Sequence, residues 1–434
     1  MGTYLSRTPS STGSRTIATV SFWVKRSSLE ASGNHYVLEA SSSTSPFNMT
    51  RVRFADDLLI IDNTLNGSAA SGFYFQSTRE YRDPSAWYHI FFSVDVTQAN
   101  STDGWKLYVN GVQQTKALTY WVQNANLEWS QSGVQMNIGR RHDNSTEHLD
   151  GYLTEFYYID GTIKSYTDFG ETDSTTGIWI PKTYSGSYGT NGFRLEFKNA
   201  AALGTDTSGQ SNNFTATNFA TSNQVVDTPT NNFSIMNPLN IFPNSTPIIT
   251  QGGLQTESQS TSGAGLCSTL AVSNGKWYAE GKIGSGATLE VGAVDIGTNA
   301  FNKGGTSTNS IGYNYGGGIG VNNSNVQTGV GTFTAGDIIG IALNMDTATG
   351  TVTFYKNGSA VGSAQNFTTS KPNAAAFYMQ SHTSGGNQSV QWNFGNAPFS
   401  ISSGNADANG YGNFEYSVPS GYYALCTKNI NQYG

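Results

Sequence analysis

Cysteine and histidine are scarce in this sequence of 434 residues, which holds two cysteines and five histidines. The two cysteines, Cys267 and Cys426, are too few for a disulfide framework and too far apart for a CxxC metal or redox motif. We expect buried thiols. A Cys267–Cys426 disulfide stays open if the first and last strands of a second domain lie side by side. The histidines lie in no motif that accompanies a serine or cysteine nucleophile.

Charge is also sparse. Charged residues make up 12% of the chain and the formal net charge is -7. The sequence has no cluster of Lys and Arg of the kind that binds phosphates, so we expect no nucleic-acid binding. It also has no apolar run of about 20 residues and no apolar core of a signal peptide near its first residues. We therefore expect neither membrane insertion nor an export signal.

Glycine, with 50 residues, and aromatic residues, at 12%, are abundant instead. This balance is typical of many short β-strands joined by turns. The chain is too long for one hydrophobic core, so two domains are the smallest sensible number. The sequence predicts an all-β protein of two tandem antiparallel sandwiches.

Two strand pairs carry the clearest local signal. Residues 87–94 form a buried strand by their apolar density, and the next strand, WKLYVNGVQQ, turns at Asn110-Gly111. Residues 337–346 and the strand TVTFYKNG repeat this order and turn at Asn357-Gly358. Asn-Gly favours a type I′ turn because both of its central residues need a positive φ.

Between these hairpins the chain becomes rich in Thr, Ser, Gln, Asn and Gly. We expect residues 201–264 to be an extended linker that is partly packed through its isolated apolar side chains, which are Phe214, Phe233, Met236, Ile241 and Phe242. Strands then follow at all-β spacing with no need for a helix. The predicted domains are a sandwich over 1–200, a second sandwich over 265–400, and an extension over 401–434 that packs back on the second domain.

In the first domain, five segments follow one another in the order SFWVKR, AWYHIFFSVD, WKLYVNGV, NIGRR and LDGYLTEFYYIDGT. Through these segments the domain resembles the LamG or concanavalin-A-like jelly roll. The second domain resembles the SPRY module, which is also a concanavalin-like sandwich, through GKWYAEGKI, VGAVDI, DIIGIALNMDTATGTVTFYKNG and QWNFGNAPF. Both resemblances imply binding modules rather than catalytic ones.

The joined pattern, with GTDTSGQSNNF, DTPTNNF and YALCTKNI, resembles virion proteins of tailed marine bacteriophages. That resemblance implies a tail fibre, a spike or a head fibre, located on the virion after assembly in the host cytoplasm and release by lysis. It implies other virion proteins as partners and a homo-oligomer, with a trimer favoured. A host-surface glycan or protein is the expected ligand. The alternative is a capsid decoration or tail assembly protein with no receptor role.

Sugar recognition by lectin folds uses an aromatic ring against the apolar face of a pyranose, with amides at the hydroxyls. The loop aromatics predicted for this role are Tyr120, Trp121, Trp129, Tyr313 and Tyr315. Each of them could instead fill a sandwich or a subunit interface.

The densest polar stretch of the chain is RRHDNSTEHLDG. Asp143, Asn144 and Asp150 within it could bind Ca²⁺, because hard cations take several carboxylate and carbonyl oxygens. LamG-like domains often hold Ca²⁺ on such rims. Further ligands could come from Asp95 and Asp103, and a solvated loop without metal is the alternative.

A glycan hydrolase would need two carboxylates about 5 to 5.5 Å apart for a retaining mechanism. The nearest candidates are Glu155 with Asp160, and Glu290 with Asp295. A spacing of five residues puts the two partners on opposite faces of a regular strand, so we expect no enzyme.

Overall fold

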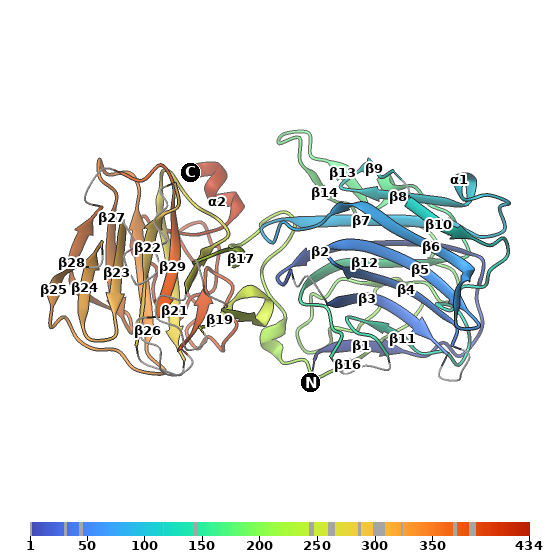
Figure 1. Ribbon diagram of the computed structural model, residues 1–434, viewed down its shortest axis with the longest axis horizontal. Helices are drawn as coiled ribbons and strands as arrows, with labels where there is room; N and C mark the ends of the chain where they lie inside the picture. Colours follow the sequence, from blue (N-terminus) through green and yellow to red (C-terminus); the bar gives the residue numbers. More distant parts are fainter. Residues whose placement is uncertain are drawn as a thin grey trace. The chain divides into compact units, whose positions relative to one another are not determined.

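The computed structural model describes residues 2–29, 33–42, 47–115, 117–142, 146–242, 247–258, 265–284, 288–297, 309–322, 324–367, 371–381 and 388–434. Two compact units divide the chain, unit 1 (Met1–Gln224) and unit 2 (Val225–Gly434), and Figure 1 shows both as β-structures. The prediction of an all-β protein with tandem sandwiches is confirmed.

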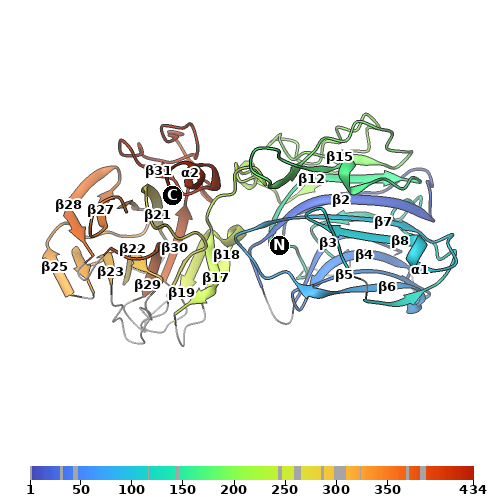
Figure 2. The same cartoon turned by 90° about the horizontal axis from the view of Figure 1, so that it is seen from above.

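Unit 1 contains two large antiparallel sheets, which Figure 2 shows as two stacked layers. Sheet I has the order β10 (Ala117–Trp121), β6 (Ser68–Glu80), β5 (Leu58–Leu65), β4 (Met49–Ala55), β3 (Asn34–Ser41), β11 (Met136–Ile138), β1 (Tyr4–Arg7) and β16 (Thr215–Thr217). Sheet II has the order β15 (Phe193–Leu195), β12 (Gly151–Asp160), β2 (Ile17–Arg26), β7 (Trp87–Asp95), β8 (Trp105–Val109) and β9 (Val112–Gln113).

The core of unit 1 lies between these two sheets. Successive side chains of a strand point to opposite faces, so alternate apolar residues of each strand meet in the middle. In β2 these are Val20, Phe22 and Val24, and all three are fully buried. The opposite, outer face of sheet I carries polar side chains instead.

The outer face of sheet II is covered by the chain that follows β12. This segment contains η1 (Tyr166–Asp168), β13 (Gly170–Thr172) and β14 (Trp179–Pro181). Its aromatic side chains pack on those of the sheet, as Phe169 does against Phe91 and Tyr157. Two short helices, α1 (Ser101–Gly104) and η2 (Thr221–Asn223), complete unit 1.

Unit 2 is also built from two large sheets. Sheet III has the order β17 (Met236–Ile241), β20 (Gly265–Ser268), β29 (Ala375–Ser381), β22 (Leu289–Asp295), β23 (Ser310–Asn314), β24 (Gly318–Val321) and β25 (Ser324–Thr328). Sheet IV has the order β18 (Ile248–Thr250), β19 (Gln255–Ser258), β30 (Gln388–Asn393), β21 (Lys276–Ile283), β26 (Ile338–Asn344), β27 (Thr351–Lys356) and β28 (Ser359–Asn366). The short helix η3 (Gln251–Gly253) joins β18 to β19.

Residues 399–434, here called the C-terminal segment, lie on the outer side of sheet IV, where Figure 2 draws them in dark red. Strand β31 (Tyr423–Ala424) pairs in parallel with β21. Helix α2 (Thr427–Tyr433) follows, within the predicted extension 401–434, for which the sequence predicted no helix. Its first N–H groups donate to Asn232 O and Asn231 Oδ1, so a distant segment caps this helix. Because these two acceptors lie about 195 residues away in the sequence, the sequence around α2 alone does not predict the helix.

The predicted linker 201–264 is divided between the units. Phe214 is buried in the core of unit 1 and β16 pairs with β1, whereas Phe233, Met236 and Phe242 are buried in unit 2. Ile241 is 38% exposed. No helix of the described residues is long and apolar enough to cross a membrane.

Both cysteines are free and fully buried. Cys267 packs in a cluster with Phe242 and Tyr378, and Cys426 packs in a different cluster with Phe233 and Phe414. Burial raises the pKa of Cys426 to about 11, so its thiol stays protonated at neutral pH. The structure therefore shows two buried thiols and no disulfide between them.

The two predicted Asn-Gly turns are confirmed. Asn110 and Asn357 have φ of 48° and 49°, and the following glycines have φ of 76° and 80°. Each asparagine also accepts a hydrogen bond through Oδ1 from the neighbouring strand, Asn110 from His89 N at 2.7 Å and Asn357 from Ile338 N at 2.8 Å. The same device therefore closes one hairpin in each unit.

Replacing Asn357 by alanine should lower the free energy of unfolding of unit 2 by about 2 kcal/mol. Alanine meets a cost of about 1 kcal/mol at positive φ, and the lost hydrogen bond to Ile338 N adds about 1 kcal/mol. Glycine tolerates a positive φ, so Asn357→Gly should lose only the hydrogen bond to Ile338 N, which is about 1 kcal/mol. Urea denaturation of both variants checks this, and equal losses would contradict the argument.

Candidate functional site

A single row of side chains crosses the whole outer face of sheet I. Its members are directly opposite one another in successive strand pairs, in the order Tyr120, Tyr74, Asp62, Arg51, Glu39, Asn137, Ser6 and Thr215. The chain neighbours of these residues, such as Phe73 and Val52, belong to the core. The row therefore points away from the core, and we call it the cross-strand row.

One end of the cross-strand row is accessible. Tyr120 is 42% exposed, and Tyr74 beside it is half-buried. The Tyr74 hydroxyl donates to Gln76 Oε1 at 3.0 Å, which holds the amide next to the two rings. The two aromatic rings and the amide thus lie together on one sheet face.

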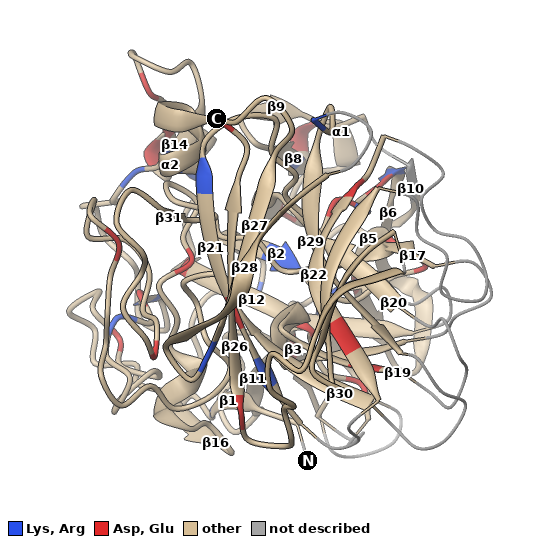
Figure 3. Ribbon diagram, turned by 90° about the vertical axis from the view of Figure 1, so that its left-hand side faces the viewer, with Lys and Arg blue, Asp and Glu red and all other residues tan. Residues whose placement is uncertain are grey.

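Next along the row, one carboxylate is shared by two guanidinium groups. Arg51 Nε donates to Asp62 Oδ2 at 3.0 Å, and Arg53 Nη2 lies 3.5 Å from Asp62 Oδ1. Asp62 is fully buried, whereas the side chains of Arg51 and Arg53 keep 15% and 13% of their exposure. Burial opposes the charge of Arg51, but Asp62 outweighs burial and raises the pKa of the guanidinium. Charged residues make up only 12% of the chain. Figure 3 shows the Lys and Arg positions and the Asp and Glu positions scattered along the ribbon.

The middle of the row is covered. Glu39 and Asn137 are 1% and 0% exposed, and His142 N donates to Glu39 Oε2 at 2.6 Å. His142 lies in the segment between β11 and β12, where Arg141 N also donates to Glu147 O. A ligand can therefore reach the end with Tyr120 and Tyr74 more easily than the centre.

The structure places two of the predicted loop aromatics of unit 1 differently. Trp129 is fully buried and contacts Phe92 and Tyr158, so it fills the sandwich and cannot meet a ligand. Trp121 is half-buried against Phe73, and its indole N–H donates to Gln98 O at 3.1 Å. Of the three aromatics predicted in unit 1, Tyr120 is the exposed one.

The predicted aromatics of unit 2 also separate. Tyr313 is fully buried against Phe333 and Phe354, so packing replaces the predicted ligand contact. Tyr315 is half-buried in the turn between β23 and β24.

The predicted Ca²⁺ ligands are only partly covered by the structure. Asp143 and Asn144 lie outside the described residues, and Asp150 is exposed. Asp95 accepts from Thr97 N at 3.0 Å and Gln98 Nε2 at 2.8 Å, so its oxygens already have donors. The described residues include no group of three or more His, Cys, Asp or Glu side chains placed to hold a metal.

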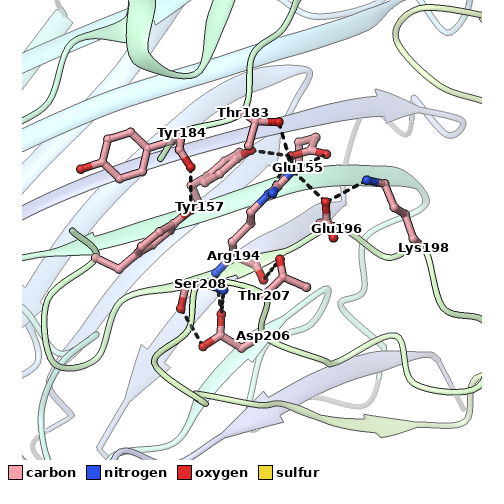
Figure 4. Close-up of polar contacts among 11 residues, drawn as sticks. Glu155, Tyr157, Thr183, Tyr184, Arg194, Glu196, Lys198, Asp206, Thr207 and Ser208 are labelled. Atoms are coloured by element: carbon pink, nitrogen blue, oxygen red, sulfur yellow. Dashed lines mark hydrogen bonds and ion pairs between the residues drawn. The ribbon is translucent and has the colours of Figure 1, made fainter. Parts of the chain in front are cut away.

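Glu155, a candidate acid for hydrolysis, is held in an ion-pair network that Figure 4 shows. Arg194 Nη2 donates to its two oxygens at 2.9 and 3.1 Å, and the Tyr157 hydroxyl also donates to Glu155. Arg194 bridges onward to Glu196. Glu155 has φ of 48°, which places it in the bulge of β12 opposite β2. This geometry serves a structural ion pair.

The partners proposed for hydrolysis belong to other networks. Asp160 accepts from Ser14 N at 2.8 Å and Asn191 N at 2.9 Å. Glu290 accepts from the Tyr378 hydroxyl, and Asp295 accepts from Gly297 N and Asn309 Nδ2. Neither pair forms the two facing carboxylates that hydrolysis requires.

A serine and a histidine that the sequence analysis did not pair are in contact in unit 1. Ser21 Oγ lies 2.8 Å from His89 Nε2, and Trp179 Nε1 donates to His89 Nδ1 at 2.9 Å. An indole N–H can only donate, so Nδ1 is the acceptor and Nε2 carries the proton. Burial lowers the pKa of His89 to about 3. His89 thus donates to Ser21 and cannot take its proton.

Comparison with protein families agrees with this architecture. Residues 2–165 match the model of the concanavalin A-like lectin/glucanases superfamily, and residues 276–397 match the SPRY domain. Residues 2–165 are thus a concanavalin A-like domain, and a SPRY domain follows over residues 276–397. The predicted order of the two modules is confirmed. The cross-strand row lies mainly in the concanavalin A-like domain, and the C-terminal segment lies outside the SPRY match.

Three solved structures are similar to the chain at low identity. The SPRY domain of human HERC1 is 18% identical over 36% of this chain and 96% of its own, with a TM-score of 0.31. The heptameric SAP-like pentraxin of Limulus polyphemus is 16% identical over 38% and 73%, with a TM-score of 0.29. The LG1-3 region of the laminin α2 chain is 10% identical over 90% and 59%, with a TM-score of 0.34. No curated protein matches the chain.

Proposed function

We propose that this chain is a structural protein of a bacteriophage virion, as part of a tail fibre, a spike or a head fibre, and that it binds a glycan or protein of the host surface without catalysing a reaction. The observation that carries the binding role is the accessible end of the cross-strand row. There Tyr120 and Tyr74 offer aromatic rings, and the Gln76 amide, whose Oε1 accepts from Tyr74, offers its N–H groups as hydrogen-bond donors. Rings beside polar groups are the means by which lectin-like sites hold sugars.

The motifs that resemble phage proteins support the placement on a particle. In unit 1, Asn212 of GTDTSGQSNNF and Asn191 accept from Arg7 Nη2. In unit 2, Asn232 of DTPTNNF and Thr427 of YALCTKNI exchange two hydrogen bonds of 2.9 and 3.0 Å. These bonds tie the first and last segments of each unit together. We place the protein on the virion as a homo-oligomer, with a trimer favoured, in contact with other virion proteins.

Particles that carry Tyr120→Ala together with Tyr74→Ala should bind host cells about tenfold more weakly, measured as the equilibrium fraction of particles adsorbed over a range of cell concentrations. Loss of two stacking rings removes at least 1.4 kcal/mol, which is a factor of about ten in binding. Ile178→Ala is the matched control, because Ile178 is 58% exposed but lies outside sheet I. Unchanged adsorption by the double variant would favour a decoration or assembly protein with no receptor role.

A further inference from the structure

The C-terminal segment has an unusual composition and lies outside the SPRY match. Residues 399–434 contain five each of Tyr, Ser, Gly and Asn, and three charged residues. Recognition loops of antibodies favour the same four residue types, because Tyr adds contact area at low entropic cost and Asn and Ser add hydrogen bonds. The segment therefore has the composition of a binding surface.

The contacts that dock the C-terminal segment on unit 2 do not involve its last residues. Asp407 accepts from Asn409 N, Tyr411 N, Ala424 N and Asn429 Nδ2, at 2.7 to 2.9 Å. Phe414, Ala424 and Cys426 are buried against sheet IV. Because the helix start is also bonded to Asn231 and Asn232, docking does not depend on the final turn of α2.

Two tyrosines form a stacked pair on this support. The ring centroids of Tyr423 and Tyr433 are 3.9 Å apart with an interplanar angle of 11°, and both side chains are half-buried. Stacking covers one face of each ring. The Tyr433 hydroxyl lies 3.4 Å from Asn409 Oδ1, and Asn409 Nδ2 lies 3.3 Å from Gln432 Oε1. Two side-chain amides thus lie at the edge of an aromatic platform.

We infer that Tyr423 and Tyr433, with Asn409 and Gln432, form a second sugar-binding site that takes a neutral pyranose. The outward ring face fits the apolar face of a sugar. The exposed Gln432 amide can donate to its hydroxyls, and Asn409, whose Nδ2 already donates to Asn429 Oδ1 at 2.8 Å, can accept from them through Oδ1. The segment contains no arginine, and its single lysine, Lys428, lies over the Tyr411 ring at 5.5 Å. The segment itself therefore supplies no cation to the platform, and a neutral sugar is the expected ligand. This site is in unit 2 and is independent of the cross-strand row.

Saturation-transfer NMR on the full chain tests the site. The probes are methyl α-glucoside, methyl α-mannoside, methyl β-galactoside and N-acetylglucosamine at millimolar concentration, with glucuronic acid for comparison. We expect transfer to at least one neutral sugar, about a fivefold loss with Tyr433→Leu, and most of the signal kept with Tyr433→Phe, which retains the ring.

The measurements are made in the background of Tyr120→Ala and Tyr74→Ala, which removes the aromatic rings of the cross-strand row, so the remaining signal reports this site alone. Ile178→Ala, at an exposed position outside both sites, is the control and should leave that signal unchanged. Thermal melting of Tyr433→Leu should match that of the unmodified chain, since docking rests on Asp407 and the helix start. Absence of transfer to all four neutral sugars overturns the inference. Transfer that survives Tyr433→Leu in this background, that disappears with Ile178→Ala, or that is stronger for glucuronic acid also overturns it.

Discussion

Replacing Asp57 by alanine should lower the free energy of unfolding of unit 1 by about 3 to 5 kcal/mol, which is the usual cost of leaving a buried charge without its partner. Arg26 is only 1% exposed, and its Nη1 donates to Asp57 Oδ1 at 2.8 Å and to Tyr81 O at 2.7 Å. Its guanidinium lies 4.9 Å from the Phe54 ring centroid. Burial lowers the pKa of Arg26, but the side chain keeps its charge at neutral pH.

A double-mutant cycle isolates the charge from the turn. Asp57 has φ of 62°, so alanine there also meets a backbone cost of about 1 kcal/mol. Arg26→Met removes the buried charge and keeps an unbranched side chain. In that background Asp57→Ala should cost only about 1 kcal/mol, measured by urea denaturation. A full loss in both backgrounds would show that the turn, and not the ion pair, carries the effect.

Much of the fold follows from local sequence. The Asn-Gly turns at Asn110 and Asn357 were predicted because two adjacent positive φ angles admit few residue pairs. The buried strand predicted at 87–94 is β7, whose apolar density reflects packing on both of its faces. These signals depend only on nearby residues, so they are visible without the tertiary structure.

The candidate site could be predicted only in part. Tyr120 was identified, but its neighbour Tyr74 was not, because the two meet through pairing of β10 with β6. The far end of the same row joins Ser6 to Thr215 across some two hundred residues. No spacing rule connects such positions before the strand order is known.

Trp129 fills the sandwich, which was the stated alternative to its ligand contact, and the local sequence gives the reason. The stretch around it is polar and resembles an exposed loop, yet Ala125, Leu127 and Trp129 are all buried at alternate positions. Glu128 between them is held by Arg15, whose Nε donates to Leu127 O at 3.0 Å. The alternation was present in the sequence, and it indicates a segment folded into the sandwich end.

The outer faces of the sheets explain where ligands can bind. In unit 1 the aromatic cluster around Phe169 covers sheet II, and in unit 2 the C-terminal segment covers sheet IV. The outer face of sheet I keeps polar side chains and an exposed end. One proposed site therefore lies on the outer face of sheet I. The other lies on the surface of the C-terminal segment, because that segment covers the outer face of sheet IV.

Replacing Glu280 by alanine should loosen the C-terminal segment and cost about 2 to 4 kcal/mol. The Glu280 side chain is fully buried and accepts from Glu415 N at 3.0 Å, Tyr416 N at 2.8 Å and Asn393 Nδ2 at 3.0 Å. Alanine would remove this acceptor from the part-buried Glu415 N and Tyr416 N, and it would leave Asn393 Nδ2 with only its bond to Asn413 O. Each lost bond of this kind costs about 1 kcal/mol or more. We expect new protease cleavage within residues 399–434. Glu171→Ala, in an exposed ion pair, should change stability by less than about 0.5 kcal/mol.

The same carboxyl should make unit 2 sensitive to pH. Burial raises the pKa of Glu280 above its ordinary value, against the hydrogen bonds from Tyr416 N, Glu415 N and Asn393 that lower it. A raised pKa in the folded state means that this group favours folding most below the ordinary glutamate pKa of about 4.3. That contribution is lost as the pH rises through the raised pKa. We therefore compare the unfolding free energy of the unmodified chain with that of Glu280→Gln. The value for the unmodified chain minus the value for Glu280→Gln should fall from pH 4 upward and then level off. A difference that rises over this range would contradict the raised pKa of Glu280.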